Sequence, residues 1–263
     1  MAVEIRPTIL KLPVKTKILR TSVLHFREID STNRYLLDNA DKPHGTVVMA
    51  DYQTAGRGRF NRVWQSPPEA ALLFSVLLKE IPSVVRPTVF PYLAAVGVYN
   101  CLRQVKELAS GVSVKWPNDV LIYGKKVCGI LMQGNIMAGC YQKLVIGIGV
   151  NVNQEESFFT KDLNSATSIS IEAGRRFDRM SLFNGLLSSL DEMLIMLQER
   201  GAKPIITMWQ KACDSMEREI AVDNGNEIYR GIFEGLADDG AMQLKTKAGL
   251  KRFYAGDVTV IKE

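Results

Sequence analysis

Two arginines and two glycines alternate in the segment DYQTAGRGRF, residues 51–60, directly after a run that reads as a β-strand. Glycine lets a backbone close tightly over a ligand, and the planar guanidinium group of arginine presents paired donors to phosphate or carboxylate oxygens. The segment has neither the GxxxxGK[ST] pattern of a P-loop nor the GxGxxG pattern of a dinucleotide-binding turn. It is therefore either a solvated turn or an anion-binding loop of another kind.

A second segment, KWPND at residues 115–119, places polar groups at the end of a strand. Pro117 has no N–H to give to a strand ladder, so we expect the strand to break there. Asn118 and Asp119 would then lie at the end of the strand. An ordinary turn with Trp116 in the core is the structural alternative.

Two more segments combine glycine with a polar group on expected strands. In GKKVCGIL, residues 124–131, Lys126 begins a strand and Gly129 leaves room for a flat group to lie against the sheet. In GIGVNVN, residues 147–153, two glycines without side chains again leave room against the sheet, and Asn151 ends the strand. Each segment taken singly also fits a structural role, and for Lys126 that role is an exposed hairpin lysine.

Hydrophobic periodicity and turn residues predict the elements that must hold these segments. Strands are expected over residues 25–30, 45–53, 71–79, 112–119, 119–133 and 143–153, with a hairpin turn at 123–125. Helices are expected over residues 31–40, 87–109, 181–201 and 204–216. The order of these elements predicts an α+β fold with a mixed, largely antiparallel central sheet and flanking helices.

The pattern changes after about residue 215, where short alternating strands are separated by Asn-Gly and Asp-Gly turns. This pattern predicts a small C-terminal β-barrel. We therefore expect a larger domain over residues 1–214 and the barrel over residues 215–263.

Composition limits the class of protein and of ligand. With 263 residues and 46% hydrophobic content, the chain can build one large core and a small one. A net charge of +5 suits an anionic ligand but is too mild to imply nucleic acid. No apolar run reads as long enough to span a bilayer, and the N-terminus lacks the apolar core of a signal peptide. Reduced thiols and a cytoplasmic location are expected, because no CxxC spacing relates the four cysteines, Cys101, Cys128, Cys140 and Cys213.

Taken together and in this order, DSTN, YQTAGRGRFNRVW, KWPNDV, KKVCGIL and GIGVNVN resemble the biotin protein ligases, from about His25 to the C-terminus. The resemblance implies a class II synthetase-like catalytic domain followed by an SH3-like barrel. It also implies a carbon–nitrogen bond-forming ligase that uses biotin, ATP and Mg²⁺. Biotin's carboxylate attacks the α-phosphate of ATP to give biotinyl-5′-AMP and pyrophosphate. A lysine of the biotin carboxyl carrier protein of acetyl-CoA carboxylase, or of a related carboxylase, then takes the biotinyl group.

The same resemblance assigns roles to individual residues. The implied catalytic residues are Lys126, Arg57, Arg59 and Asp119, of which Asp119 is also the implied Mg²⁺ ligand. The implied biotin-binding residues are Ser31, Thr32, Asn33, Gln53, Gly56, Arg57, Gly58, Arg59, Lys126 and Gly129. The implied nucleotide-binding residues are Arg59, Arg62, Trp64, Lys115, Asn118 and Asn151. The chemistry agrees, because a carboxylate and a polyphosphate repel each other unless cations lie between them.

The arginine-rich loop has a further implication for dynamics. Two glycines raise the entropy of an open loop, and two arginines repel each other until an anion lies between them. Residues 54–62 are therefore expected to be mobile without ligand and ordered with biotin or biotinyl-AMP.

Two departures from the family pattern bear on function. Many members carry Glu where this chain has Gln133, so the role of that carboxylate is in doubt. Bifunctional members begin with a helix-turn-helix domain of roughly sixty residues, whereas about two dozen residues precede HFREID here. We therefore expect a ligase without specific DNA binding. The role of residues 1–22 stays open, and a homodimer formed through sheet edges would fit the family.

Two other functions stay open on the sequence alone. A lipoate or octanoate protein ligase is similar in fold and also acylates a carrier lysine, but it follows the GRGR and KWPND pattern less closely. A non-enzymatic biotin-sensing repressor would need a DNA-reading element. ATP–pyrophosphate exchange separates the three, because it would depend on biotin, on lipoate, or on neither.

Overall fold

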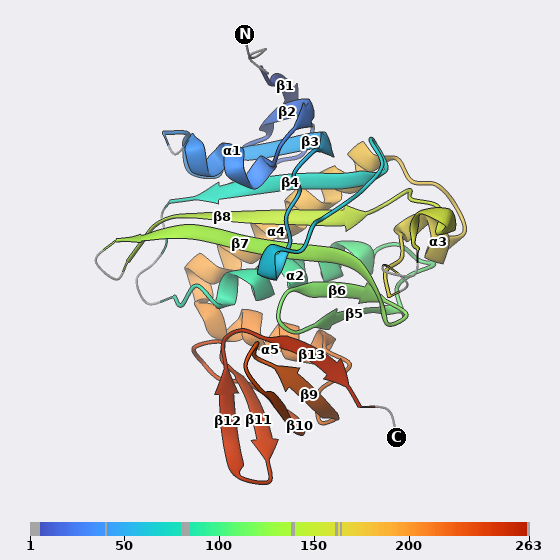
Figure 1. Cartoon of the computed structure of the whole chain (residues 1–263). Coiled ribbons are helices and arrows are strands. Elements are labelled where there is room, and N and C mark those ends of the chain that lie inside the picture. Colours follow the sequence, from blue (N-terminus) through green and yellow to red (C-terminus); the bar gives the residue numbers. More distant parts are fainter. Residues whose placement is uncertain are drawn as a thin grey trace.

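An eight-stranded sheet forms the body of the computed structural model, which describes residues 6–39, 41–79, 81, 85–137, 140–160, 163 and 165–261 (Figure 1). The strands lie in the order β1-β2-β3-β4-β8-β7-β6-β5. Every described neighbouring pair is antiparallel except β2 with β3, so the sheet is mixed and largely antiparallel, as predicted. The bounds are β1 Thr8–Lys11, β2 Ser22–Ile29, β3 Val47–Gln53, β4 Ala71–Leu78, β5 Val112–Lys115, β6 Asp119–Ile122, β7 Lys125–Met137 and β8 Cys140–Asn151.

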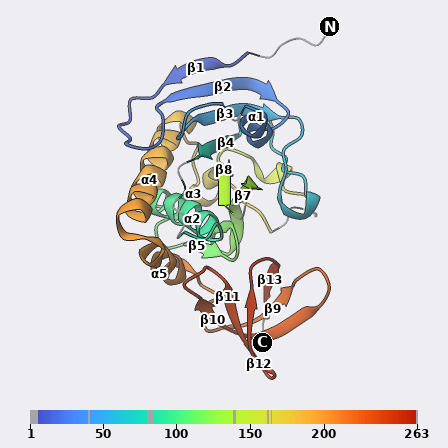
Figure 2. The ribbon, with the colours of Figure 1, turned by 90° about the vertical axis from the view of Figure 1, so that its left-hand side faces the viewer.

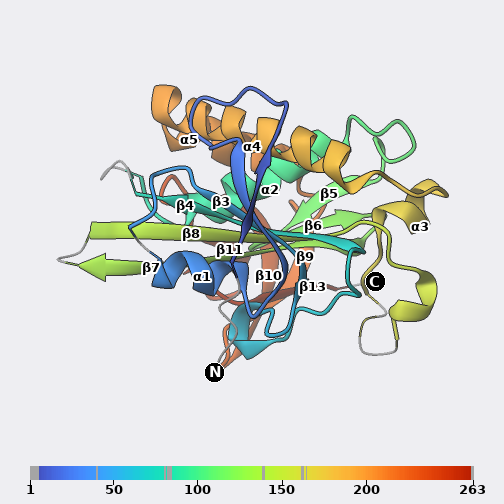
Figure 3. The same cartoon turned by 90° about the horizontal axis from the view of Figure 1, so that it is seen from above.

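Helices cover the two faces of this sheet unequally. Helices α2 (Val89–Leu102), α4 (Arg179–Arg200) and α5 (Ala202–Ala212) lie on one side, and the short helix α1 (Thr32–Asp38) lies on the other (Figure 3). The main apolar core fills the space between the three longer helices and the sheet. Ser31 caps α1 by accepting a hydrogen bond from the Arg34 N–H, as the hydroxyl-rich DSTN segment predicts.

Helix α4 is long and apolar enough to cross a membrane by length and composition, so the expectation that no apolar run reaches that length is wrong. In the fold, however, 56% of the tested stretch is buried, and α4 packs on α2. Its buried Asp191 accepts the backbone N–H groups of Lys17, Ile18 and Leu19 at 2.7–2.8 Å. Helix α4 is therefore packed as a core helix, and its Asp191 also holds the segment after β1 in place.

The C-terminal sheet is antiparallel and lies beyond α5 (Figure 2). Its order is β12-β11-β10-β9-β13, with bounds β9 Glu219–Asp223, β10 Ile228–Leu236, β11 Met242–Thr246, β12 Gly249–Phe253 and β13 Asp257–Val260. Gly225 and Gly240 adopt positive φ at the Asn-Gly and Asp-Gly turns, which explains the choice of glycine there. A small C-terminal β unit follows, while the domain boundary after residue 214 stays a prediction.

Some elements differ from the sequence prediction. The expected helix over 87–109 ends at Leu102, and turns carry the chain on, with Val105 and Leu108 still packed against the core. The apolar spacing thus continues beyond the helix, which is why the pattern overestimates its length. Strand β1 and helix α3 (Ile169–Ala173) were not predicted, because runs of four or five residues give too short a pattern.

Candidate active site

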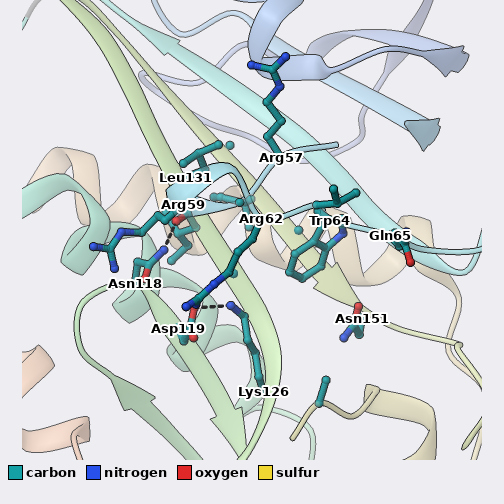
Figure 4. Close-up of a pocket in the computed structure, with 18 of the residues that line it drawn as sticks. Arg57, Arg59, Arg62, Trp64, Gln65, Asn118, Asp119, Lys126, Leu131 and Asn151 are labelled. Carbon is teal, nitrogen blue, oxygen red and sulfur yellow. Dashed lines mark hydrogen bonds and ion pairs between the residues drawn. The ribbon is translucent and has the colours of Figure 1, made fainter. Parts of the chain in front are cut away.

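A cavity of about 520 Å³ lies where the loop between β3 and β4 covers the ends of several strands (Figure 4). Its walls come from the start of α1, from that loop, from β5 to β8, and from β13 of the C-terminal sheet. Of the sequence-predicted site residues only Gly56 is absent from the lining. The predicted residues that line the cavity are Ser31, Thr32, Asn33, Gln53, Arg57, Gly58, Arg59, Arg62, Trp64, Lys115, Asn118, Asp119, Lys126, Gly129 and Asn151.

One end of the cavity is a network of hydroxyl and amide groups. Gln53 Oε1 accepts hydrogen bonds from the Thr32 N–H at 2.8 Å and from the Thr32 hydroxyl at 3.0 Å. The Ser75 hydroxyl lies 2.7 Å from Thr32 Oγ1 and 2.6 Å from Asn33 Oδ1, and it has only one proton to donate between them. Thr32, Asn33 and Ser75 are buried, so this end offers a ligand fixed polar partners rather than a solvated surface.

Gly147 and Gln133 fix the position of Asn33 in this network. A Cβ on Gly147 would lie 2.2 Å from Asn33 Oδ1, so only glycine leaves room for that side chain. Asn33 Nδ2 donates to Gln133 Oε1 at 2.8 Å and to the Leu131 carbonyl at 3.2 Å. The amide oxygen of Gln133 therefore does what a carboxylate oxygen could do here, and it does so without a charge.

Lys126 and Asp119 form an ion pair in the wall of the cavity. Lys126 Nζ lies 2.7 Å from Asp119 Oδ1, and both side chains are partly exposed to the cavity (Figure 4). Lys126 follows a tight turn in which Tyr123 and Gly124 adopt positive φ, and Asp119 begins β6 directly after the break at Pro117. The hairpin and the broken strand thus bring a cation and an anion together, a pairing that the two motifs do not predict.

The indole ring of Trp64 lies flat against two glycines that face each other in neighbouring strands. Gly129 of β7 pairs with Gly149 of β8, and a Cβ on either would come within 2.9 Å or 2.6 Å of the ring. Lys126 Nζ is 5.9 Å from the ring centroid, and the buried Trp64 Nε1 has no hydrogen-bond partner among the described residues. The predicted flat surface exists, and in this conformation the protein's own indole covers it.

The glycine-rich loop is held by its own backbone. The Gly58 N–H donates to the Arg62 carbonyl at 2.7 Å, and the Trp64 N–H donates to the Gly56 carbonyl at 3.0 Å. A Cβ on Gly56 would lie 2.6 Å from the Trp64 carbonyl oxygen, so glycine serves the turn itself there. Arg57 is exposed and points away from Lys126 (Figure 4), and its side chain has no ion pair within the described chain.

Arg59 and Arg62 contact the C-terminal sheet instead. Arg59 Nη1 donates to the Gly256 carbonyl at 3.2 Å, and the Arg62 guanidinium pairs with Asp257. Burial lowers the pKa of Arg59, an effect that the charges of Asp257 and Asp119 oppose. The loop therefore bridges the two sheets of the molecule.

Asn118 and Asn151 line the cavity but also hold its wall together. Asn118 Nδ2 donates to the Ile130 carbonyl. Asn151 Nδ2 donates to the Thr167 carbonyl at 3.0 Å, and its Oδ1 accepts from Gln154 Nε2 at 2.8 Å. A ligand at Asn151 would therefore meet an amide with one N–H donor and one acceptor lone pair left to offer.

Several residues of the site were missed by sequence reasoning. Ser75 does not line the cavity but supports Thr32 and Asn33 from behind, and its hydroxyl in the apolar run ALLFSVLLK is a readable signal of a polar contact from a buried strand. Phe158 and Phe159 follow the GIGVNVN motif, and Asp257 and Thr259 come from the far C-terminus. No local pattern marks these last two as parts of the site.

The described part of the chain contains no group of three His, Cys, Asp or Glu side chains that could hold a metal ion. Asp119 is thus a single carboxylate, which suits Mg²⁺ only if other ligands come with the substrate. Cys101, Cys128 and Cys213 are free and buried, and burial raises the pKa of the Cys101 thiol to about 11. A thiolate nucleophile at any of these three is disfavoured.

Comparisons with known proteins agree with this geometry. A model of the biotin/lipoate A/B protein ligase family matches residues 25–151, and a model of the biotin protein ligase C-terminal domain matches residues 216–260. The bifunctional ligase/repressor BirA of Bacillus subtilis is 32% identical over 95% of this chain and 77% of its own length. The biotin–[acetyl-CoA-carboxylase] ligase of Paracoccus denitrificans is 29% identical over 87% and 96%. A solved biotin protein ligase from Aquifex aeolicus, in complex with biotin and ATP, has a TM-score of 0.78 and 28% identity over 92% of this chain and 99% of that chain.

Proposed function

Since this chain belongs to the biotin protein ligase family and is a ligase enzyme, we propose that it adenylates biotin with ATP and transfers the biotinyl group to a lysine of a biotin carboxyl carrier protein. The observation that carries the proposal is one cavity with a buried polar network at one end and a cationic centre beside it. A carboxylic acid held between these two places would meet the nucleotide's phosphates at Lys126.

The polar end favours biotin over lipoate. The ureido ring of biotin offers two N–H donors and a carbonyl acceptor, which the hydroxyl and amide groups around Thr32, Asn33 and Gln53 can match. A dithiolane ring has no such groups, so its binding would remove water from the donors and acceptors that still face the cavity without pairing them, at a cost of about 1–3 kcal/mol each. The lipoate or octanoate ligase is therefore the weaker of the two enzyme candidates.

In the first step, the chain's own cations would balance the charge between a carboxylate and the α-phosphate. Lys126 and Arg59 line the same cavity, and the glycine-rich loop lies over it. Mg²⁺ would arrive with ATP, bound mainly by its phosphate oxygens, and Asp119 is the carboxylate positioned to complete its coordination. Because Asp119 now pairs with Lys126, that role requires the pair to rearrange.

In the second step, the closed loop would protect biotinyl-AMP from water until the carrier lysine arrives. The free, buried thiols fit a reducing compartment, and we place the reaction in the cytoplasm. We propose a carboxylase carrier because relatives such as the Paracoccus denitrificans enzyme are named biotin–[acetyl-CoA-carboxylase] ligases.

The experiment that tests the function is a mass spectrum of a biotin carboxyl carrier domain incubated with the protein, biotin, ATP and Mg²⁺. The carrier should gain one biotinyl group, and a carrier whose target lysine is replaced by arginine should gain none. Without carrier, pyrophosphate release should stop after about one equivalent, because the intermediate stays bound. Modification with lipoate but not biotin would show the second enzyme candidate to be correct.

Replacing Gln133 tests the polar end. Gln133→Leu removes the acceptor for Asn33 Nδ2, so the KM for biotin should rise about two- to tenfold, the equivalent of one hydrogen bond. Gln133→Glu keeps an acceptor oxygen in the same place, so its KM should stay close to the wild-type value. The adenylation rate at varied biotin provides both values, and equal values for the two variants would exclude the assigned contact.

A further inference from the structure

The last strand of the C-terminal sheet contacts the arginine-rich loop at the mouth of the cavity. Asp257 pairs with the Arg62 guanidinium, and the neighbouring Gly256 carbonyl accepts from Arg59. Asp257 also lines the cavity itself, together with Val258 and Thr259. An anion from a different sheet thus lies beside two arginines at a site proposed to receive a polyanion.

The other contacts of the C-terminal sheet show which partner in this contact is able to move. The Tyr92 hydroxyl of α2 donates to the Gly240 carbonyl at 2.8 Å, and the rings of Trp209 and Phe233 lie 6.3 Å apart. Both of those rings are fully buried, so separating the sheet from the helices would expose a large apolar surface. The C-terminal sheet is therefore fixed in place, and the arginine-rich loop is the part that can move away from it.

Compared with these buried contacts, the contact between the loop and the C-terminal sheet is exposed to solvent, so a ligand can replace it. The side chain of Arg62 is 67% exposed and that of Asp257 is 39% exposed. Ion pairs this open contribute little, because water and salt screen them. A phosphate group, with more oxygens and more charge than a carboxylate, makes stronger charge-assisted hydrogen bonds to the same guanidinium groups.

We infer that Asp257 is a positioning residue that holds the arginine-rich loop on the C-terminal sheet in the ligand-free enzyme, and that nucleotide phosphate takes its place on Arg62. The inference rests on the proposed function for the identity of the anion. It assigns the C-terminal sheet a part in substrate binding. In this arrangement Asp257 competes with the nucleotide for Arg62, and it keeps the loop ordered when no nucleotide is bound.

Asp257→Asn tests both halves of the inference, because asparagine keeps the shape of the side chain and removes its charge. The KM for ATP should fall about two- to fivefold with kcat unchanged, the range that one exposed ion pair allows. In the ligand-free protein, the loop amides of Gly58 and Trp64 should exchange with deuterium faster by a similar factor. With biotinyl-AMP bound, the exchange should equal that of the wild type. Asp257→Glu restores the charge and should reverse both changes.

Asp238→Asn is the matched control. This exposed carboxylate belongs to the same C-terminal region, and within the described chain its side chain has no ion pair. It therefore reports what the loss of one negative charge does without the loop contact. If Asp257→Asn lowers the KM but leaves loop exchange like that of Asp238→Asn, Asp257 only repels the nucleotide and the inference is wrong. Unchanged exchange together with an unchanged or raised KM also overturns it. A wild type that forms no biotinyl-AMP would refute the proposed function instead, and the ligand-free exchange would still test the contact.

Discussion

Lys126→Ala is expected to slow biotin adenylation about 10²–10³-fold at saturating biotin and ATP, the usual cost of removing one group that stabilises charge in a transition state. The ammonium group lines the cavity in which a carboxylate and a phosphate would approach each other. Its loss also leaves Asp119 unpaired beside the incoming anions. Single-turnover formation of biotinyl-AMP, measured in a quenched-flow experiment, gives the chemical step directly.

The neighbouring lysine provides the control for this prediction. Lys125 is exposed and pairs with Glu172 at 3.6 Å rather than with a cavity residue, so Lys125→Ala should adenylate at close to the wild-type rate. The double variant Lys126→Ala/Asp119→Asn separates lost stabilisation from the repulsion left by Asp119. A Lys126→Ala rate within about threefold of wild type, far inside the expected loss, would make Lys126 only a hairpin lysine.

Arg57→Ala is expected to release biotinyl-AMP about 10- to 100-fold faster than the wild type, the equivalent of one charge-assisted hydrogen bond. Arg57 is exposed and its guanidinium group points away from Lys126 (Figure 4), so its role requires the loop to rearrange around the adenylate. The released anhydride should then biotinylate bystander lysines. Mass spectrometry of an added protein without a carrier sequence detects this.

Amide exchange over residues 54–62 tests the rearrangement itself. Protection should be partial without ligand, because the contacts with Gly256 and Asp257 hold the loop, and it should rise with biotin plus ATP, because the anion brings the arginines together. Arg57→Lys keeps the charge but loses the paired donors, so it should leak to an intermediate degree. Equal protection with and without ligand would mean that the loop is preformed, and Arg57→Ala should then retain the intermediate.

The sequence predicts the motifs of the site well and their partners poorly. The break at Pro117 and the turn before Lys126 are local patterns. The 2.7 Å contact between Asp119 and Lys126 is not, because Asp119 pairs with Gly129 and Lys126 pairs with Leu121 in the two antiparallel strands. The pairing of Arg62 with Asp257 spans 195 residues, and no periodicity encodes a contact between two separate sheets. Strand β1 is similar, because its four residues carry no pattern of their own.

Side-chain orientation is a further limit on what the sequence alone can show. Arg57 and Arg59 are equivalent in the alternating GRGR pattern, yet Arg57 is exposed and points away from Lys126, whereas Arg59 is partly buried and donates to the Gly256 carbonyl. Gly56 and Gly58 are equally alike, but only Gly56 is excluded from carrying a side chain by a close backbone oxygen. Both differences come from the backbone of the loop, which tertiary contacts determine.

The indole that covers the two sheet glycines gives this enzyme a built-in optical signal. The chain has three tryptophans, and Trp116 and Trp209 are buried in the core at 1% and 0% exposure. Trp64 and Trp116 both line the cavity, but Trp116 is almost fully buried and its Nε1 donates to the Tyr92 hydroxyl. Trp64 Nε1 has no hydrogen-bond partner among the described residues, and an ammonium group lies near its ring. Because the emission of an indole depends on the polarity and charge around it, we expect most of the ligand-dependent fluorescence to come from Trp64. Titrations of biotin and nucleotide therefore need no attached dye.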